Sequence, residues 1–420
     1  MDNPPPSVQV QCMQTDCDII IVGGGLNGPA LAVAAAGAGL SSIVIDALPA
    51  TDMQKLGFDG RSYAIALTSA HLLQAIGLWP QLEQDAQPML DIKVSDGRAG
   101  EGPSPFFMHF DHAEIEEGPM GYMIEDRHLR PALQAALHAS DKIQQISGVA
   151  VVAQETGPAG VTVTLADGRR VSGRLLAGCD GRNSGTAERA GIGRTGWPYQ
   201  QTALVCAISH EQPHNGVAHQ FFMPPGPLAI LPLSGNRSSI VWSETASDAA
   251  RIHAMNDEDY LSVLRPRFGS FLGEISLAGA RYTYPLSLSL ASSMIAPRTA
   301  LVGDAAHGVH PIAGQGLNAG FRDIAALAEV ITDAHRRGED IGSEVTLGSY
   351  QTWRRFDNTA LAMATDTFNR LFSNDNPVLR ATRDIAMGLI GKMPGLRRGF
   401  IREAAGLTGE LPRLLKGQPL

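Results

Sequence analysis

The sequence predicts an α/β fold in which a Rossmann-like nucleotide-binding lobe is interleaved with a β-sheet-rich lobe and followed by a helical C-terminal region. Three patterns support this prediction. Residues 18–46 show a strand, a Gly-rich turn, an Ala-rich helix and a second strand, which together make a βαβ unit. Residues 200–242 show several short strands in succession, and residues 300–420 return to a strand, a Gly-rich turn and helices. With 420 residues, of which 44% are hydrophobic, the chain can bury two cores.

Local patterns place the first elements in order along the chain. In the βαβ unit we expect a strand at 18–22, a helix that ends near Ala38, and a strand at 42–46. Apolar residues then recur at helical spacing in two segments, which predicts amphipathic helices at 65–79 and 127–139.

The middle of the chain has the composition of strands. Residues 161–165 alternate Val and Thr, and Asp167-Gly168 separates them from a second apolar run that starts at Val171. Asp-Gly suits a tight turn, so these residues predict a β-hairpin. Four further strands are expected in the sheet-rich lobe, at 203–208, 220–223, 228–233 and 238–242.

Composition argues against several classes of protein. A net charge of −9 argues against nucleic acid as a partner, because such partners need a basic surface. The cysteines, which form neither a disulfide framework nor a zinc cluster, are Cys12, Cys17, Cys179 and Cys206. The uncharged stretch 19–45 could be mistaken for a membrane span, but it contains six glycines and begins as a strand. We therefore expect a cytoplasmic protein without a bound metal or a spanning helix.

The segment Gly23-Gly24-Gly25-Leu26-Asn27-Gly28 follows the first strand and opens the first helix. Gly23 allows a tight turn, Gly25 lets backbone amides approach a pyrophosphate, and Gly28 lets helix and strand pack closely. Asp46 ends the next strand, where a carboxylate can accept hydrogen bonds from ribose hydroxyls. This pattern predicts a dinucleotide site but does not separate NAD from FAD.

A second motif favours FAD. Gly303-Asp304 follows a predicted strand, and an Asp at that place can bind the ribityl chain that only a flavin has. The Gly-rich turn at 314–320 opens a helix whose N-terminus can support negative charge on a reduced isoalloxazine. We interpret His307 as a packed histidine and do not assign it as a general base. Asp323 lies outside the motif, and we do not expect FAD binding to depend on it.

Together with a central Cys179-Asp180-Gly181-Arg182-Asn183-Ser184, these motifs resemble the three fingerprints of the group A FAD-dependent aromatic monooxygenases, which share the para-hydroxybenzoate hydroxylase fold. Four other segments resemble the ubiquinone-biosynthesis hydroxylases of the UbiH/UbiF/VisC family. These segments are 58–67, 226–233, 365–374 and 402–407. The resemblance covers about residues 17–416.

The resemblance implies an FAD-binding lobe, an interleaved sheet-rich substrate lobe, and five segments along the chain. The segments are a flexible leader at 1–15, the first part of the FAD-binding lobe at 16–195 with an inserted substrate-lobe segment near 80–125, the substrate lobe at 196–290, the second part of the FAD-binding lobe at 291–345, and C-terminal helices at 346–420.

The resemblance also implies which residues contact FAD. They are Gly23, Gly25, Gly28 and Asp46 at the ADP part, Arg61 and Arg127 at the phosphates or ribityl chain, Asp180 and Gly181 at both FAD and NAD(P)H, Gly303 and Asp304 at the ribityl chain, and Gly314, Gln315, Gly316, Leu317 and Asn318 at the flavin ring edge. The catalytic candidates at the ring edge are Pro311, Gly314 and Gln315. The sequence identifies no base for a phenol.

Two positions depart from the family pattern. Asp46 stands where Glu is usual, which shortens the reach of the carboxylate. Ala187 stands where an Arg is usual, and Arg189 follows two places later, so the positioning of the reductant is the feature in doubt. We expect Ala187→Arg to leave flavin reduction unchanged or to speed it. We expect Asp180→Ala to slow reduction more than it alters stability.

The implied activity is hydroxylation of the aromatic ring of a polyprenylated phenol in ubiquinone biosynthesis. NADH or NADPH would reduce FAD, and O2 would form a flavin C4a-hydroperoxide that transfers OH to the ring. Two alternatives stay open: a hydroxylase of a soluble aromatic compound, and a non-catalytic flavoprotein that scaffolds a ubiquinone-synthesis complex. Other ubiquinone-synthesis proteins are therefore expected partners.

The C-terminal residues 376–420 are basic and amphipathic, with eight Lys or Arg against three acidic residues. This composition predicts peripheral docking on an anionic membrane surface at the cytoplasmic face. The alternative is a helical cap that packs on the FAD-binding lobe with its charges solvated.

Overall fold

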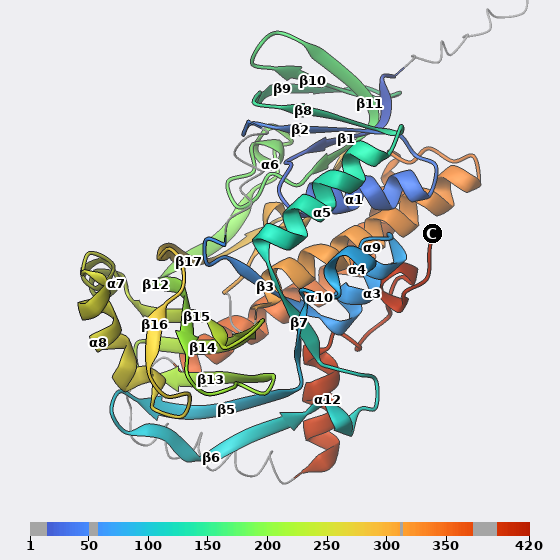
Figure 1. Ribbon diagram of the computed structural model, residues 1–420. Coiled ribbons are helices and arrows are strands. Elements are labelled where there is room, and N and C mark those ends of the chain that lie inside the picture. Colours follow the sequence, from blue (N-terminus) through green and yellow to red (C-terminus); the bar gives the residue numbers. More distant parts are fainter. Residues whose placement is uncertain (1–14, 50–57, 311–313, 373–392) are drawn as a thin grey trace, which may run out of the picture.

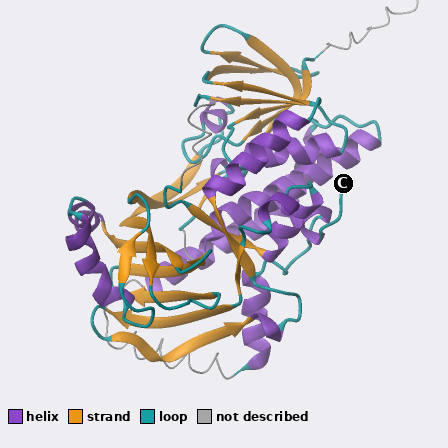
Figure 2. Ribbon diagram, viewed as in Figure 1, coloured by secondary structure: helices purple, strands orange, loops and turns teal. Residues whose placement is uncertain are grey.

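The computed structural model describes residues 15–49, 58–310, 314–372 and 393–420. An eight-stranded sheet lies at one end of the molecule and a nine-stranded sheet at the other, and long helices run alongside the first and reach the second (Figures 1 and 2). A small three-stranded sheet lies between them. Its strands are β3 (Ser62–Ala66), β4 (Gln87–Met89) and β7 (Gly121–Glu125).

The eight-stranded sheet has a parallel centre in the order β19-β11-β1-β2-β8. These strands are β1 (Cys17–Val22), β2 (Ser42–Asp46), β8 (Ile143–Ser147), β11 (Arg170–Gly178) and β19 (Thr299–Leu301). Ile19, Ile20 and Ile21 of β1 are fully buried, because helices cover one face of this strand and an antiparallel layer covers the other. The other strands of the sheet are β9 (Val151–Thr156), β10 (Val161–Leu165) and β18 (Ile295–Ala296), and β10 forms the predicted hairpin with β11.

Four helices form the main core with this sheet. They are α1 (Asn27–Gly37), α5 (Asp126–Ala139), α9 (Gln315–Arg336) and α10 (Glu344–Phe372). Small residues on α1 and α9 let the two helices pack closely, and Phe321, Ile324 and Leu327 of α9 are fully buried in the contact region. Segments that are far apart in the chain therefore share one core.

The helix expected at 65–79 is wrong at both ends. Ile65 and Ala66 belong to β3, where they pair with Tyr122 and Gly121 of β7. The helix itself is α3 (Leu67–Ala75), and a short α4 (Trp79–Leu82) follows. Gly77, with a φ of 79°, takes the left-handed conformation that separates them.

The nine-stranded sheet contains the four strands expected in the sheet-rich lobe. Its strands are β5 (Asp91–Arg98), β6 (Gly102–Asp111), β12 (Arg194–His210), β13 (Val217–Met223), β14 (Gly226–Leu233), β15 (Arg237–Thr245), β16 (Ile275–Leu277), β17 (Tyr282–Ala291) and β20 (His307–Gly308). One face packs on α7 (Ala246–His253) and α8 (Asp257–Phe268), which the sequence analysis did not predict. Trp242 and Tyr260 are buried in that contact. The division of the chain into domains stays a prediction.

The C-terminal region returns to both lobes. Helix α12 (Pro394–Ala404) contacts β6, and Ile401 is fully buried there. The 3-10 turn at Arg413–Lys416 contacts α3 and α9 through the buried Leu414 and Leu415. Across the residues that the structure describes, none of the helices combines the length and the apolar character that crossing a bilayer requires.

Candidate active site

The carboxyl ends of four parallel strands meet at one edge of the eight-stranded sheet. Backbone bonds hold the residues just past these ends in line: Cys179 N–H donates to Val22 O at 2.7 Å, and Val302 N–H donates to Gly178 O at 2.9 Å. The chain leaves β1 for β2 on one side, and β11 lies on the other side. Dinucleotides bind at such a switch point in open α/β sheets. The three sequence motifs therefore meet at the edge where a dinucleotide is expected.

The Gly-rich turn after β1 has the shape that a pyrophosphate needs. A Cβ atom at Gly23 would collide with the carbonyl oxygen of Cys179, and one at Gly28 would collide with the carbonyl oxygen of Gly23. A Cβ at Gly25 would meet nothing within 4 Å. The first two glycines permit close backbone packing, and the third is exposed with open space beside it.

Asp46 closes the same turn. Its carboxylate accepts hydrogen bonds from the backbone N–H groups of Gly24 and Leu48, the latter at 2.7 Å. This places the carboxylate at the end of β2 beside the glycines. Its contact with a ribose stays a prediction.

The Gly303-Asp304 turn presents its carboxylate outward. The Asp304 side chain is 40% exposed, and its nearest ion-pair partner among the described residues is Arg182 Nε at 3.4 Å. Arg194 fixes the backbone of the turn. Its guanidinium donates to the carbonyl oxygen of Asp304 at 3.1 Å and to that of Ala305. A carboxylate on a fixed backbone with exposed oxygens can accept hydrogen bonds from a polyol.

Helix α9 begins beside this turn. Gly314 caps it in the left-handed conformation, with a φ of 65°. Asn318 fixes the first turn of α9 to β3: its Oδ1 accepts from Ala66 N–H at 2.8 Å, and its Nδ2 donates to Ala64 O at 2.9 Å. A Cβ at Gly316 would meet nothing within 4 Å, so this face of the helix start is open. Gln315 and Leu317 are half-buried at the same helix start.

The side chain of Asn318 thus bonds to the backbone of β3. If Asn318 contacts the flavin ring as predicted, its backbone makes that contact. Pro311 lies outside the described residues. The ring-edge assignments stay predictions.

Arg61 and Arg127 are each held by carboxylates. Arg61 Nη2 lies 2.7 Å from Asp59 and 3.2 Å from Asp126, and the hydrogen bond to Asp59 raises the pKa of the guanidinium further. Arg127 Nε lies 2.6 Å from the buried Glu125, which also binds Arg237 at 2.6 Å. Both predicted arginines are about one-third exposed, so each can still reach a ligand. Their roles toward FAD stay predictions.

Asp180 has a local structural role. Its carboxylate accepts from Ser184 Oγ at 2.5 Å and from Thr186 N–H at 2.9 Å, which holds the start of α6 (Gly185–Arg189). Arg189 bends away and donates to Val151 O at 3.2 Å. Gly181 has a φ of 79° and open space around its α-carbon. The carboxylate of Asp180 is thus engaged by the protein, and Gly181 is the more open of the two predicted contacts.

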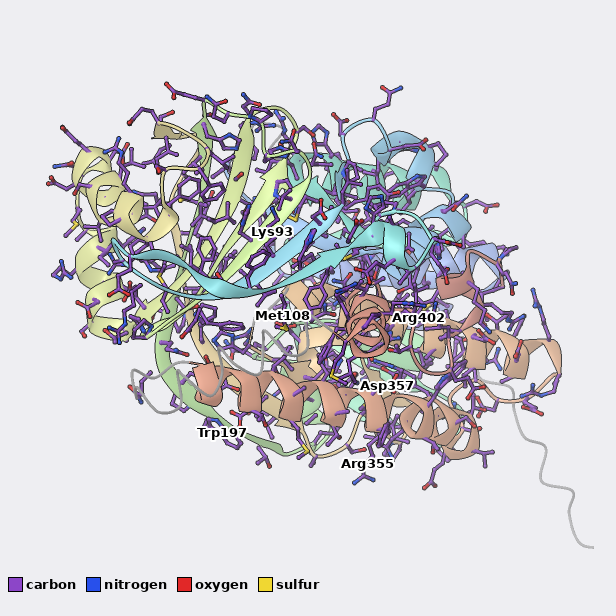
Figure 3. The ribbon with its side chains drawn as sticks, turned by 90° about the horizontal axis from the view of Figure 1, so that it is seen from below. Lys93, Met108, Trp197, Arg355, Asp357 and Arg402 are labelled. Atoms are coloured by element: carbon purple, nitrogen blue, oxygen red, sulfur yellow. The ribbon has the colours of Figure 1, made fainter. Side chains whose placement is uncertain are left out.

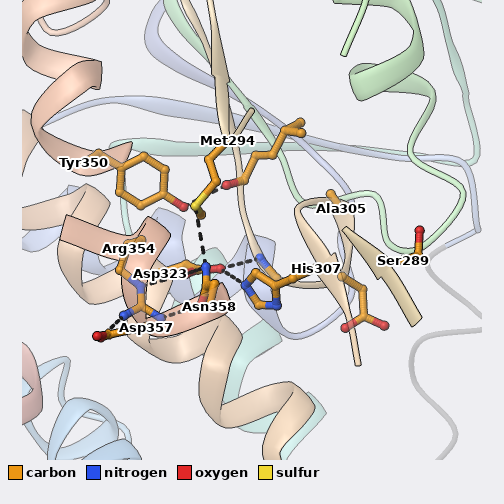
Figure 4. A network of polar contacts seen from close by, with 12 residues as sticks. Ser289, Met294, Ala305, His307, Asp323, Tyr350, Arg354, Asp357 and Asn358 are labelled. Atoms are coloured by element: carbon orange, nitrogen blue, oxygen red, sulfur yellow. Dashed lines mark hydrogen bonds and ion pairs between the residues drawn. The ribbon is translucent and has the colours of Figure 1, made fainter. Parts of the chain in front are cut away.

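A buried ionic network that the sequence analysis missed supports the Asp304 turn (Figure 4). Asp323 on α9 is fully buried, and its carboxylate accepts from Gly303 N–H at 2.9 Å, His307 Nε2 at 2.5 Å and Arg354 Nε at 2.9 Å. Burial would raise the pKa of Asp323, but His307 and Arg354 outweigh it and hold the pKa at about 2. The interpretation of His307 as a packed histidine agrees with this geometry.

We predicted that Asp323 lies outside the FAD motif. In the structure its carboxylate instead holds the backbone of the Gly303-Asp304 turn from the core. The available signal was a charged residue on an otherwise apolar helix face that includes Phe321 and Ile324.

The comparison with known proteins agrees with this arrangement. Residues 16–364 match the family described as FAD binding domain. Over 406 residues the chain is 44% identical to the ubiquinone hydroxylase UbiL of Rhodospirillum rubrum, with 96% of this chain and 93% of that protein covered. The chain belongs to the FAD-dependent hydroxylases of the ubiquinone-biosynthesis family.

Other relatives agree. The hydroxylase is 33% identical to the 3-demethoxyubiquinol 3-hydroxylase of Escherichia coli (strain K12), over 93% of this chain and 98% of that one. Its fold resembles the crystal structure of p-nitrophenol 4-monooxygenase PnpA from Pseudomonas putida, with a TM-score of 0.78, 19% identity, and 95% and 100% of the two chains covered. The predicted family, fold class, enzyme class and FAD cofactor are confirmed.

The residues at the strand ends fit FAD. The exposed turn at Gly25 and the start of α1 would receive the pyrophosphate, Asp304 the ribityl hydroxyls, and the start of α9 the ring. FAD reduced by NAD(P)H supplies the activation of O2. The protein's part is to bind, orient and shield the reacting groups.

Proposed function

We propose that this hydroxylase adds oxygen to the aromatic ring of a polyprenylated phenol in ubiquinone biosynthesis, with NADH or NADPH and O2 as co-substrates. The observation that supports this most is the 44% identity to a ubiquinone hydroxylase, which extends through both sheets and the C-terminal region. The exposed Asp304 carboxylate and the exposed turn at Gly25 are in keeping with the FAD contacts that the reaction needs.

Turnover with a defined substrate tests this proposal. Purified holoenzyme is incubated with NADH or NADPH, isotopically labelled O2 and a farnesylated phenol in detergent micelles. We expect the phenol to stimulate NAD(P)H oxidation and to gain one labelled oxygen atom, as measured by mass spectrometry. Stimulation by small water-soluble phenols, but not by the farnesylated one, would refute the polyprenyl substrate. Mass spectrometry of the quinone precursors that accumulate in a deletion strain then identifies the missing ring position.

We also propose that the enzyme meets its water-insoluble substrate as a peripheral protein on an anionic membrane surface, alone or beside other ubiquinone-synthesis proteins. The exposed apolar side chains on α12, and on Met393 just before it, support membrane contact. Met393, Leu396 and Phe400 are 51%, 49% and 40% exposed, and the neighbouring Arg398 is exposed as well. Figure 3 shows this side of the molecule, with Arg402 on α12 and Met108 on β6.

Several basic residues of the C-terminal region form ion pairs with the rest of the protein. Among the described tail residues, Arg397 pairs with Glu114 at 2.7 Å and Arg402 with Glu117 at 3.1 Å. Arg413 pairs with Asp333 at 2.5 Å and also with Glu329. Acidic residues of the rest of the protein thus pair with three of the described basic residues, whereas Arg380, Arg383 and Lys392 lie outside the described residues. We expect apolar contact to contribute to membrane binding beside charge.

Liposome flotation tests the membrane proposal. We expect the protein to float with anionic vesicles at low salt and to remain partly bound at high salt. The triple change Met393→Ser, Leu396→Ser and Phe400→Ser should abolish flotation. Val152→Ser, which alters a 56% exposed side chain on the other lobe, should not affect it. A parent protein that never floats at any salt concentration would refute membrane contact.

A further inference from the structure

His310 is a buried histidine that has no hydrogen-bond partner among the described residues. The residue is 0% exposed, and neither Nδ1 nor Nε2 bonds to any group in the described parts of the chain. A neutral imidazole carries one donor and one acceptor, and proteins pair such groups when they bury them. Two open hydrogen-bonding sites on one buried ring therefore require an explanation.

Burial alone does not explain the unbonded nitrogens, because both ring nitrogens of another buried histidine have hydrogen-bond partners. His210 is 6% exposed, and its two ring nitrogens lie 2.8 Å from Gln212 O and 3.0 Å from Ser238 Oγ. The open nitrogens of His310 are thus a local feature that points to a ligand.

The position of His310 indicates that the ligand binds between the flavin motifs and the nine-stranded sheet. It lies in the chain between Asp304, the expected ribityl contact, and Gly314, which caps α9. The ring of Tyr199, from β12 of the nine-stranded sheet, packs edge-on against it at a centroid distance of 5.2 Å. His310 thus lies at the boundary between the flavin motifs and the sheet-rich lobe. Burial, together with the positive charge of Arg182, lowers the pKa of His310 to about 4, so the ring is neutral near pH 7.

We infer that His310 accepts the hydrogen bond of the substrate's phenol O–H and takes up its proton while the ring receives oxygen. The inference rests on the proposed function, because it requires a phenol as substrate. It also supplies the phenol base that the sequence analysis did not identify.

The phenol O–H bond breaks, an imidazole N–H bond forms, and the released electron pair moves into the ring as a ring carbon bonds the incoming oxygen. That carbon then loses its hydrogen as a proton, which neutralises the negative charge left on the oxygen donor. The imidazolium returns its proton to the phenol oxygen, and His310 ends neutral. The ring loses two electrons and the donor gains two; FAD, NAD(P)H and O2 of the hydroxylase activity supply the donor.

Two substitutions separate binding from proton transfer. His310→Phe removes both nitrogens, whereas His310→Gln keeps a hydrogen-bond acceptor that cannot take up the proton. The probes are 2-farnesylphenol and its methyl ether, which lacks the O–H, titrated into oxidised holoenzyme and followed by the change in visible flavin absorption. His210→Gln is the matched control, because His210 is also buried and lies outside the site.

We expect the parent to bind the phenol about tenfold more tightly than the ether, and His310→Phe to abolish this preference by weakening the phenol alone. His310→Gln should keep most of the preference but lower the product-forming kcat by about 100-fold, with NAD(P)H oxidised and H2O2 released instead. His210→Gln should change neither measurement.

The outcomes separate the two proposals. A parent whose flavin absorption responds to neither probe would refute the substrate class, and the inference with it. A parent that binds both probes equally, or a folded, FAD-loaded His310→Phe that still prefers the phenol, would overturn the inference alone. If His310→Phe does not fold, His310→Gln decides: an unchanged product-forming kcat would overturn the inference.

Discussion

The carboxylate of Asp323 accepts a hydrogen bond of 2.9 Å from the backbone N–H of Gly303, 20 positions earlier in the chain. Gly303 begins the turn that carries Asp304, so a buried charge on α9 fixes the backbone of the expected ribityl contact. Arg354 on α10 balances that charge at 2.9 Å. The orientation of the Asp304 turn therefore depends on the packing of two long helices.

Asp323→Asn should lower the free energy of unfolding by about 3 kcal/mol, because it leaves the buried Arg354 without its full counter-charge. It should also lower the flavin content of the purified protein. The control is Asp333→Asn on the same helix, where the side chain is 41% exposed and pairs with Arg413. The control should cost less than about 1 kcal/mol. Chemical denaturation followed by circular dichroism measures both, and equal costs would contradict the role of Asp323.

Asp304→Ala should weaken FAD binding by about tenfold to a hundredfold, because charge-assisted hydrogen bonds to ribityl hydroxyls are lost. The apoprotein should keep its stability, since the side chain is 40% exposed. Asp167→Ala is the matched control: Asp167 is 39% exposed and pairs with Arg169 far from the motif. Titration of apoprotein with FAD decides the point, and equal affinity in both variants would refute the assignment.

The expectations for Asp180 and Ala187 change with the structure. Ala187 is 1% exposed on α6, so Ala187→Arg would force a guanidinium into the core. We now expect this variant to unfold at lower denaturant concentration rather than to reduce flavin as well as the parent. An Ala187→Arg protein of unchanged stability that reduces flavin faster would restore the original expectation.

Asp180→Ala should cost about 1–2 kcal/mol of stability, since it removes the carboxylate that Ser184 and Thr186 bond. Asp180→Asn, which keeps an acceptor oxygen, should cost less. Denaturant midpoints and anaerobic reduction by NADH, measured on the same samples, distinguish a structural loss from slower reduction. A normal midpoint with slow reduction would instead favour a direct contact with the reductant.

Two histidines, the buried His310 and the half-buried His219, should make the fold sensitive to acid. Burial and Lys93 lower the pKa of His219 to about 4, and burial and Arg182 lower that of His310 to about 4. In the unfolded chain a histidine binds a proton below about pH 6.5. In the folded protein these two histidines stay neutral until the pH approaches 4, so between these two pH values only the unfolded state binds the protons. The free energy of unfolding should therefore fall as the pH falls through this window, by about 2 kcal/mol per histidine at pH 5.

His219→Gln should recover about 2 kcal/mol of the loss between pH 7 and pH 5. The exposed His138, changed to Gln, should recover none. Urea denaturation at the two pH values makes the comparison. An identical pH dependence in parent and His219→Gln would show that His219 titrates normally.

Elements that rest on one continuous pattern could be predicted from the sequence. Strand β1 and the turn at Gly23–Gly28 lie in a single stretch whose residue types specify strand, turn and helix in order. The pairing of Ile65 with Tyr122 could not be predicted, because the local apolar spacing at 65–79 suits a helix and a distant strand decides the outcome.

The site shows the same limit. Gly303 and Asp304 carry a recognisable motif, whereas Asp323 and Arg354 are 31 positions apart and no local signal links them. His310 was passed over because its significance lies in bonds it does not make among the described residues, which only a structure reveals.

Strand β19 joins the parallel edge only after every strand of the nine-stranded sheet except β20 has been made, and Asn318 bonds α9 to β3 still later. During synthesis, the Gly-rich turn therefore leaves the ribosome long before the residues that complete its pocket. Until then the first βαβ unit lacks the Asp304 turn and the start of α9, and the edge of β11 that pairs with β19 has no neighbour. Slowing translation ahead of residue 299 would lengthen the time for which this edge stays unpaired, and we expect it to lower the yield of folded enzyme.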